Sequence, residues 1–345
     1  MAVCLACRSR ADSRRHAILA ACCGLLWLAI ATTTRAAEPS PLASPLIDWT
    51  NALQAGVMLD ETARRADLRR AETRLARVAA PRDGCAEALG AQRYADLHVE
   101  LARARDALGD RRGAEAAWHA VLDCTPRNAT AQLALARLSM LAGESAAARA
   151  RLARALELAP QFERSRQLGI RLDYLAGRWT EAASGAAELA AEHRNTAGHL
   201  SPSASKADDT EDGEPSGVRL SAAYWDLLAL LARRRGGLPP TTTGDEPDPA
   251  LGNFWPAPLW EHLLGLRDEA SLVEAMETAA TNPRQRREMA CEALYYTAQL
   301  ALAEGHSEDG RQRLARVVNL KVLYFVEHDL ALAELAGQRA AGAAF

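Results

Sequence analysis

A period of 34 residues is the feature that most constrains how this chain can fold. Three glycines recur at that step, at Gly109, Gly143 and Gly177. Alanines and prolines keep the same step at Ala114, Ala148 and Ala182 and at Pro126 and Pro160. Glycine readily adopts the left-handed backbone that ends a helix, alanine lets two helices approach closely, and proline cannot continue a helix. The period therefore predicts consecutive helical hairpins with a glycine turn inside each one.

Composition favours the same architecture. Hydrophobic residues make up 49% of the chain but aromatic residues only 5%, so alanine and leucine supply most of the apolar surface. Both residues have high helix propensity. A 34-residue helix-turn-helix unit with small residues at these positions is typical of the tetratricopeptide repeat, or TPR. We therefore predict an all-α fold, a TPR α-solenoid of helix-turn-helix units with a C-terminal capping helix.

The register of the period places the repeats along the chain. Three repeats occupy residues 95–128, 129–162 and 163–196, and a fourth fits residues 291–324 with Gly305 at its turn. An apolar stripe upstream predicts a helix over about residues 57–80. A helix over residues 324–336 should cap the stack, because an uncovered terminal repeat would expose its inner face. The apolar face of this helix consists of Phe325, Leu330, Leu332 and Leu335.

These assignments divide the chain into six predicted segments. They are a signal peptide at 1–36, a linker at 37–56, the N-terminal helices with the first three repeats at 57–196, a disordered acidic insert at 197–217, an irregular helical segment with a Pro/Gly-rich loop at 218–290, and the fourth repeat with the capping helix at 291–340. The insert is assigned as disordered because its acidic and serine-rich composition cannot bury a hydrophobic core.

The first 36 residues have the layout of a secretory signal peptide. Four arginines precede an apolar stretch at residues 17–31, and small residues stand before a cleavage position after Ala36. The apolar stretch is shorter than the roughly 20 residues of a typical membrane-spanning helix. We therefore predict export to the periplasm with a mature N-terminus at Ala37. Two alternatives remain, a retained N-terminal anchor and lipidation of Cys22, which follows the lipobox-like sequence Leu19-Ala20-Ala21.

Only three of the seven cysteines follow the predicted leader: Cys85, Cys124 and Cys291. Three cysteines cannot all pair within one chain, so they do not form a disulfide framework. A single bridge between Cys85 and Cys124 is one expectation in an oxidising compartment. Buried free thiols are the alternative.

Charge and motifs argue against several functional classes. The net charge of −3 gives no electrostatic reason to expect nucleic acid. The sequence has no His-Glu-x-x-His pair, no Gly-x-Ser-x-Gly elbow, no P-loop and no dinucleotide-binding glycine fingerprint. Glu327 and His328 are neighbours, but adjacent helical side chains point about 100° apart and do not form a natural dyad. We predict a non-enzymatic protein without catalytic residues, cofactor or metal.

A recurring arginine is the strongest candidate for a binding function. Arg103, Arg137 and Arg171 occupy the same position in the first helix of three successive repeats. First helices line the concave face of a TPR superhelix, so these arginines should form a ladder that binds carboxylates of a partner protein or peptide. The same register predicts these neighbours in the groove: Asp96, Val99, Asp106, Leu133, Met140, Gln167 and Tyr174. Alternatively, the arginines are only solvated or pair with Asp96, Asp106 and Asp173.

The order of segments resembles a known family. Three repeats and a break are followed by Cys291-Glu292-Ala293-Leu294-Tyr295-Tyr296, Gly305 and a Phe325-Val326-Glu327-His328 helix. This order is similar to the NlpI family of bacterial envelope lipoproteins, over about residues 92–193 and 255–337. The resemblance implies an outer-membrane-associated periplasmic protein that forms homodimers. It also implies an adaptor that brings peptidoglycan hydrolases, particularly endopeptidases, to a tail-specific protease or to synthesis complexes.

Three functional classes follow from the sequence. The first is a periplasmic adaptor for enzymes of cell-wall metabolism. The second is a TPR scaffold for another envelope process, such as outer-membrane assembly or secretion. The third is an enzyme with an unrecognised helical active site. In the first two classes the partners are proteins or peptides, and the chain meets a membrane only through a retained or lipidated N-terminus.

Overall fold

The computed structural model describes residues 46, 66, 69–70, 72–74, 76–77, 91–199, 217–240 and 249–342. Helices dominate these residues and no β-strand occurs among them, which confirms the predicted all-α class. The predicted signal peptide with Cys22, the predicted linker apart from Leu46, Cys85, and most of the acidic insert and Pro-rich loop lie outside the described residues. Within the described ranges, no helix combines the length and apolar character needed to cross a bilayer.

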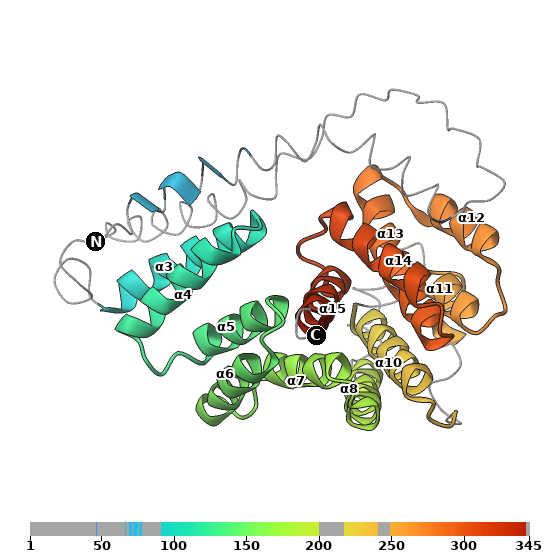
Figure 1. The fold of residues 1–345 in the computed structure, drawn as a ribbon, viewed down its shortest axis with the longest axis horizontal. Helices are drawn as coiled ribbons and strands as arrows, with labels where there is room; N and C mark the ends of the chain where they lie inside the picture. Colours follow the sequence, from blue (N-terminus) through green and yellow to red (C-terminus); the bar gives the residue numbers. More distant parts are fainter. Residues whose placement is uncertain are drawn as a thin grey trace, which may run out of the picture. The chain divides into compact units, whose positions relative to one another are not determined.

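Helices that follow one another in the sequence pack as neighbouring pairs (Figure 1). The first three hairpins are formed by α3 (Ala91–Ala107) with α4 (Arg111–Cys124), α5 (Ala129–Leu141) with α6 (Ser145–Leu158), and α7 (Glu163–Leu175) with α8 (Trp179–His199). A fourth hairpin is formed by α13 (Pro283–Ala303) and α14 (Ser307–Leu320). The four predicted helical hairpins are therefore present at the predicted places in the chain.

Every one of these hairpins turns at its predicted glycine. Gly109, Gly143, Gly177 and Gly305 have φ angles of 77°, 78°, 70° and 85°, in the left-handed region that favours glycine. In the second hairpin, the N–H of Gly143 donates to the Met140 carbonyl at 3.0 Å and the next N–H donates to the Ser139 carbonyl at 2.9 Å. The same pair of hydrogen bonds closes the other three turns. This is the Schellman arrangement, which satisfies the last carbonyls of the first helix.

The fourth hairpin departs from the alanine pattern for a steric reason. Gly310 stands on α14 where the first three repeats carry alanine. A Cβ added to Gly310 would come within 2.5 Å of Leu302 Cγ on α13. Because that distance is well inside van der Waals contact, the close packing of these two helices requires glycine.

Between the third and fourth hairpins the chain forms α10 (Gly217–Gly236), the 3₁₀ helix η1 (Pro249–Leu251), α11 (Ala257–Leu263) and α12 (Glu269–Ala279). The longest of these, α10, packs along α8 and against α13. Its buried residues include Trp225, Leu227 and Leu231. The segment predicted to be irregularly helical therefore contains one long helix, which contributes a full layer to the core.

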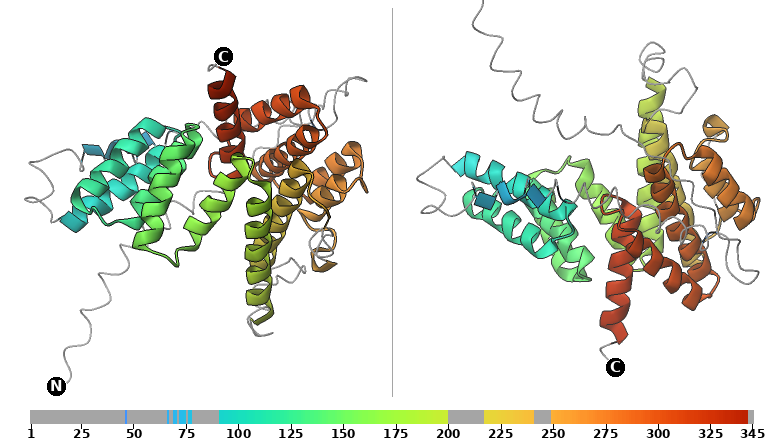
Figure 2. Two further views of the ribbon diagram at one scale, coloured as in Figure 1. Left: turned by 60° about the horizontal axis from the view of Figure 1, so that its bottom comes forward. Right: turned by 90° about the horizontal axis from the view of Figure 1, so that it is seen from above.

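The last helix, α15 (Val326–Gly342), does more than cover the final hairpin. It packs against α13 and α14, as expected of a cap, but also against α5 and α7 (Figures 1 and 2). Leu330 and Ala331 belong to the hydrophobic core around α7–α14, whereas Leu332 and Ala333 belong to the core of α3–α7. The predicted cap is thus better described as a helix that joins the two cores, because its neighbouring side chains point to different sides.

Candidate functional site

The three arginines of the predicted ladder have different surroundings. Arg103 on α3 is exposed and forms an ion pair with Glu100 at 2.9 Å, with 58% of its side-chain surface accessible. Arg137 on α5 is engaged in an internal ion-pair cluster, and Arg171 on α7 lines a pocket. Equivalent positions in the repeat therefore do not form a row of equivalent free cations. The binding of a partner by the ladder stays a prediction. It applies only to those arginines of the ladder that are accessible.

Arg137 is held by two carboxylates from different parts of the chain. Its Nε and Nη2 donate to the two oxygens of Asp329 on α15, at 2.5 and 2.9 Å, and Nη1 donates to Asp106 at 2.7 Å. This bidentate geometry is the strongest form of arginine–carboxylate contact. Burial acts to raise the pKa of Asp329, but the His328 imidazole and the Arg137 guanidinium outweigh it and lower that pKa. The alternative expectation, that Arg137 pairs with Asp106, is confirmed by this contact.

Three of the predicted groove residues are core residues. Leu133, Met140 and Tyr174 have 9%, 3% and 1% of their surface exposed. The Tyr174 hydroxyl donates to Gln299 on α13 at 2.9 Å, so it belongs to an internal hydrogen-bond network. In this structure these three side chains are therefore covered by the protein itself, because the repeat register gives a helix position and not the depth at which it is buried.

The remaining predicted groove residues are accessible to different degrees. Asp96 is exposed and accepts a hydrogen bond from Gln92 at 2.9 Å, and Val99 is half-buried on the same helix. Gln167 lies one turn before Arg171, donates to Glu163 at 2.6 Å and also lines the pocket. Asp106 is engaged with Arg137 as described above. The structure therefore brings together Gln167 and Arg171, and separately Asp106 and Arg137.

Cys124, at the end of α4, is disulfide-bonded. Cys85, the partner expected from the sequence, lies outside the described residues. Cys291 is a buried free thiol on α13. Burial raises the pKa of the Cys291 thiol well above its usual value, which disfavours the reactive thiolate.

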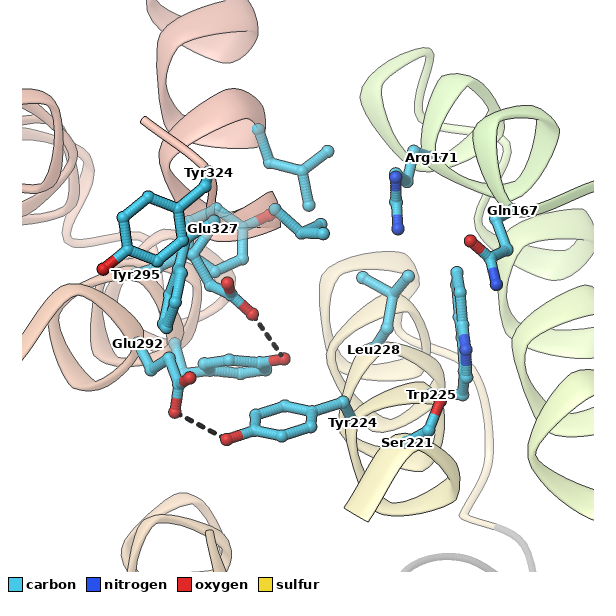
Figure 3. Close-up of a pocket in the computed structure, with 14 residues that line it drawn as sticks. Gln167, Arg171, Ser221, Tyr224, Trp225, Leu228, Glu292, Tyr295, Tyr324 and Glu327 are labelled. Carbon is cyan, nitrogen blue, oxygen red and sulfur yellow. Dashed lines mark hydrogen bonds between the residues drawn. The ribbon is translucent and has the colours of Figure 1, made fainter. Parts of the chain in front are cut away.

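A pocket of about 290 Å³ lies between α7, α10, α13 and the start of α15 (Figure 3). The side chains from α7 are polar, whereas the other three segments contribute both polar and apolar groups to the wall. The lining includes Gln167 and Arg171 from α7, Tyr224, Trp225 and Leu228 from α10, Glu292, Tyr295 and Tyr296 from α13, and Phe325, Glu327 and Leu330 from the last segment. Concave sites with a few convergent polar groups on an apolar wall are typical of ligand-binding pockets.

Arg171 forms the cationic side of this pocket. Its guanidinium carbon lies 5.5 Å from the centroid of the Trp225 ring, a favourable cation–π arrangement. Its Nε is buried without a hydrogen-bond partner, and no ion pair to a described residue engages the guanidinium. Burial lowers the pKa of Arg171 from its ordinary value, against the opposing charges of Asp329 and Glu327. A buried charge that lacks contacting partners is costly, so an anionic group would be stabilised here.

Two carboxyl groups form the opposite side, as Figure 3 shows. Glu292 accepts hydrogen bonds from the Tyr224 hydroxyl at 2.8 Å and from the Trp255 indole N–H. Glu327 accepts a long hydrogen bond from the Tyr296 hydroxyl at 3.4 Å. Burial, followed by the nearby charge of Glu327, raises the pKa of Glu292 to about 8. Burial also raises the pKa of Glu327.

The sequence patterns do not identify this pocket. They mark Glu327 only as a neighbour of His328, and Glu292 only as part of a family resemblance. A signal is nevertheless present in the sequence, because Glu292 interrupts a strongly apolar helical stretch and such an isolated carboxylate requires polar partners when buried. Which partners it meets depends on the packing of four helices, and no local pattern encodes that packing.

The pocket has the groups to bind a polar ligand but not those of a metal centre. No cluster of three or more metal-ligating His, Cys, Asp or Glu side chains occurs in the parts of the chain that the structure describes. Comparison with known proteins adds no assignment: no family model matches the chain, and no curated protein is significantly similar to it.

Proposed function

We propose that this chain is an exported, non-enzymatic TPR scaffold that binds other proteins in the cell envelope. The observation that carries this proposal is the series of three helical hairpins at a 34-residue step, closed by the same glycine turn each time. Repeated helical hairpins present long surfaces that suit the binding of proteins and peptides. The repeat pattern supports the TPR assignment because glycine, alanine and proline recur at the helix boundaries and contacts.

The resemblance to the NlpI family makes the proposal more specific. It suggests that the partners are peptidoglycan hydrolases and a tail-specific protease, and that the scaffold acts in maintenance of the cell wall as a periplasmic, outer-membrane-associated homodimer. The signal-peptide layout of residues 1–36 supports export. A scaffold for outer-membrane assembly or secretion is the alternative proposal.

The face of α3 is the part of the predicted groove on which partner binding can be tested most directly. Asp96 and Arg103 are exposed there, and Val99 adds a half-buried apolar contact between them. The inner side of the next two repeats is partly covered by α15, which contacts α5 and α7. We therefore assign the partner-contacting surface to the exposed side of the first hairpin.

Affinity capture of the full chain from an envelope fraction tests this proposal. We expect the wild-type protein to retain a hydrolase or a tail-specific protease, and Arg103→Glu to retain less of it. Arg154→Glu is the matched control, because Arg154 is a similarly exposed arginine on α6 that pairs with Glu157. Capture of assembly or secretion components without any hydrolase or protease would favour the alternative scaffold. Absence of a saturable partner would contradict both proposals.

The N-terminus is tested separately by mass spectrometry of the mature protein. Cleavage after Ala36 gives a chain that begins at Ala37, the expected result. A diacylated Cys22 would contradict that cleavage position and favour a lipoprotein.

A further inference from the structure

The pocket between α7, α10, α13 and α15 has a guanidinium group on one side and two carboxyl groups on the other. Arg171 projects from α7 on one side, and Glu292 and Glu327 project from α13 and α15 on the other (Figure 3). Arg171 and Glu327 influence one another electrostatically, yet they form no ion pair. The guanidinium and the carboxyl groups therefore line one cavity and are not neutralised by contact with each other.

We propose that this pocket binds a small zwitterion of the α-amino acid class, with its carboxylate on Arg171 and its ammonium group between Glu292 and Glu327. A guanidinium binds a carboxylate through two parallel N–H···O bonds, which accounts for the anionic end of the ligand. The two carboxyl groups account for the cationic end. This inference is independent of the proposed scaffold function and concerns a different surface.

Aromatic rings support the assignment of a cation to the carboxyl side. The Tyr224 and Tyr296 rings lie beside Glu292 and Glu327, to which their hydroxyls donate hydrogen bonds. Aromatic faces attract ammonium groups, and the attraction increases when water is excluded. An ammonium group here would also stabilise the charged form of the two carboxyl groups, which burial disfavours.

The size and apolar lining of the pocket restrict the ligand further. A volume of about 290 Å³ is at the lower end of the roughly 300–1,000 Å³ of ligand pockets. It suits a single amino acid or a dipeptide. Leu228 and Phe325 line the same cavity, so we expect a ligand with an apolar side chain rather than a charged one.

Isothermal titration calorimetry of the full chain with leucine and with the dipeptide alanyl-leucine tests the inference. We expect at least one of the two to bind, and the comparison of the two determines which length fits. N-acetylleucine lacks the ammonium group and leucinamide lacks the carboxylate. Each should bind at least tenfold more weakly than leucine, because a charge-assisted contact typically contributes a factor of about ten to a hundred.

Variants assign the contacts to residues. Arg171→Met should reduce binding by a factor of about ten to a hundred, and Glu327→Gln should reduce it in the same direction. Arg166→Met is the matched control, because Arg166 lies on the same helix, is exposed and pairs with Glu192 outside the pocket. A circular dichroism melt of each variant monitors folding.

Three outcomes would overturn the inference. The first is absence of binding by both leucine and alanyl-leucine. The second is N-acetylleucine binding as tightly as leucine, which would show that the carboxyl side does not recognise a cation. The third is undiminished binding by folded Arg171→Met. The blocked ligands are tested on the wild-type protein, so they decide the matter even if Arg171→Met does not fold.

Discussion

Arg137 and Arg171 occupy the same position in successive repeats, and both lie near the first turn of α15, but their surroundings differ. Arg137 makes three hydrogen bonds to two carboxylates, including both oxygens of Asp329. Arg171 has a tryptophan face and an open pocket instead. The carboxylates that α15 contributes differ in parallel: the pKa of Asp329 is lowered, whereas burial raises the pKa of Glu327 two residues earlier.

The comparison separates what a repeat determines from what the rest of the chain determines. The 34-residue register gives both arginines the same helical position. The bidentate partner of Arg137, Asp329, is 192 residues away in sequence, on α15. Satisfied charges of this kind fix the position of one helix on another, whereas unsatisfied charges in a pocket favour a ligand. We infer that α15 packs on the inner side of both repeats, pairing with Arg137 in the second and leaving a pocket beside Arg171 in the third.

The largest effect is expected at the satisfied cluster. Asp329→Asn removes both charge-assisted bonds to Arg137 while preserving the size of the side chain. We expect the free energy of unfolding to fall by about 3 kcal/mol, because removing one partner leaves a partly buried charge less well compensated. Urea unfolding monitored by circular dichroism measures the change. Glu327→Gln, two residues earlier, should lower the free energy of unfolding much less. An equal loss in the two variants would contradict the difference between the Arg137 cluster and the Arg171 pocket.

The pocket carboxyl groups predict an unusual dependence of stability on pH. The pKa of Glu292 is about 8 in the folded protein, against an ordinary value of 4.5. The folded state therefore holds this proton more tightly, so the stabilisation is complete below about pH 4.5 and is lost as pH rises through about 8. Stability should decrease by up to about 1.4 kcal/mol per pH unit within this window.

Glu292→Gln tests the origin of that dependence. Its amide oxygen can accept the hydrogen bonds from Tyr224 and Trp255 that Glu292 accepts now. We expect a flatter profile of unfolding free energy between about pH 5 and about pH 8, measured by urea titration at each pH. An unchanged slope in Glu292→Gln would show that another group titrates in this range.

Two glycine turns provide a test of how tightly α15 packs on the second hairpin. Gly143 and Gly305 both have positive φ, so alanine at either position should cost about 1–2 kcal/mol from the backbone alone. A Cβ at Gly143 would also lie 3.3 Å from the backbone of Ala336 on α15, whereas nothing lies within 4 Å at Gly305. Gly143→Ala should therefore lower the thermal midpoint more than Gly305→Ala. Equal midpoints would argue against tight packing of α15 on this turn.

The sequence predicts the regular part of this fold well and its long-range part poorly. The hairpin turns could be located because Gly109, Gly143, Gly177 and Gly305 have a local requirement for left-handed backbone. The burial of Tyr174 and the pairing of Arg137 with Asp329 could not be predicted, since both depend on helices far away in the chain. The pocket is not predictable from local patterns for the same reason, because its two charged sides come from separate hairpins.

The smallest effect on stability is expected at the exposed arginine of the first repeat. Arg103→Glu removes an exposed ion pair with Glu100, which typically contributes less than about 1 kcal/mol. We expect an almost unchanged melting curve together with weaker partner capture. The result would distinguish Arg103, a docking residue, from Asp329, a structural residue whose change to asparagine should lower stability strongly. A large loss of stability in Arg103→Glu would show that Arg103 is structural as well.

Two double-mutant cycles test the central difference between the arginines most directly. One cycle combines Arg137→Met with Asp329→Asn, and the other combines Arg171→Met with Glu327→Gln. Each compares unfolding free energies of the single and double variants with the wild type. We predict a coupling energy of about 2 kcal/mol in the first cycle and less than about 1 kcal/mol in the second. Coupling in the Arg171 cycle that equals or exceeds that of the Arg137 cycle would contradict an unpaired arginine in the pocket.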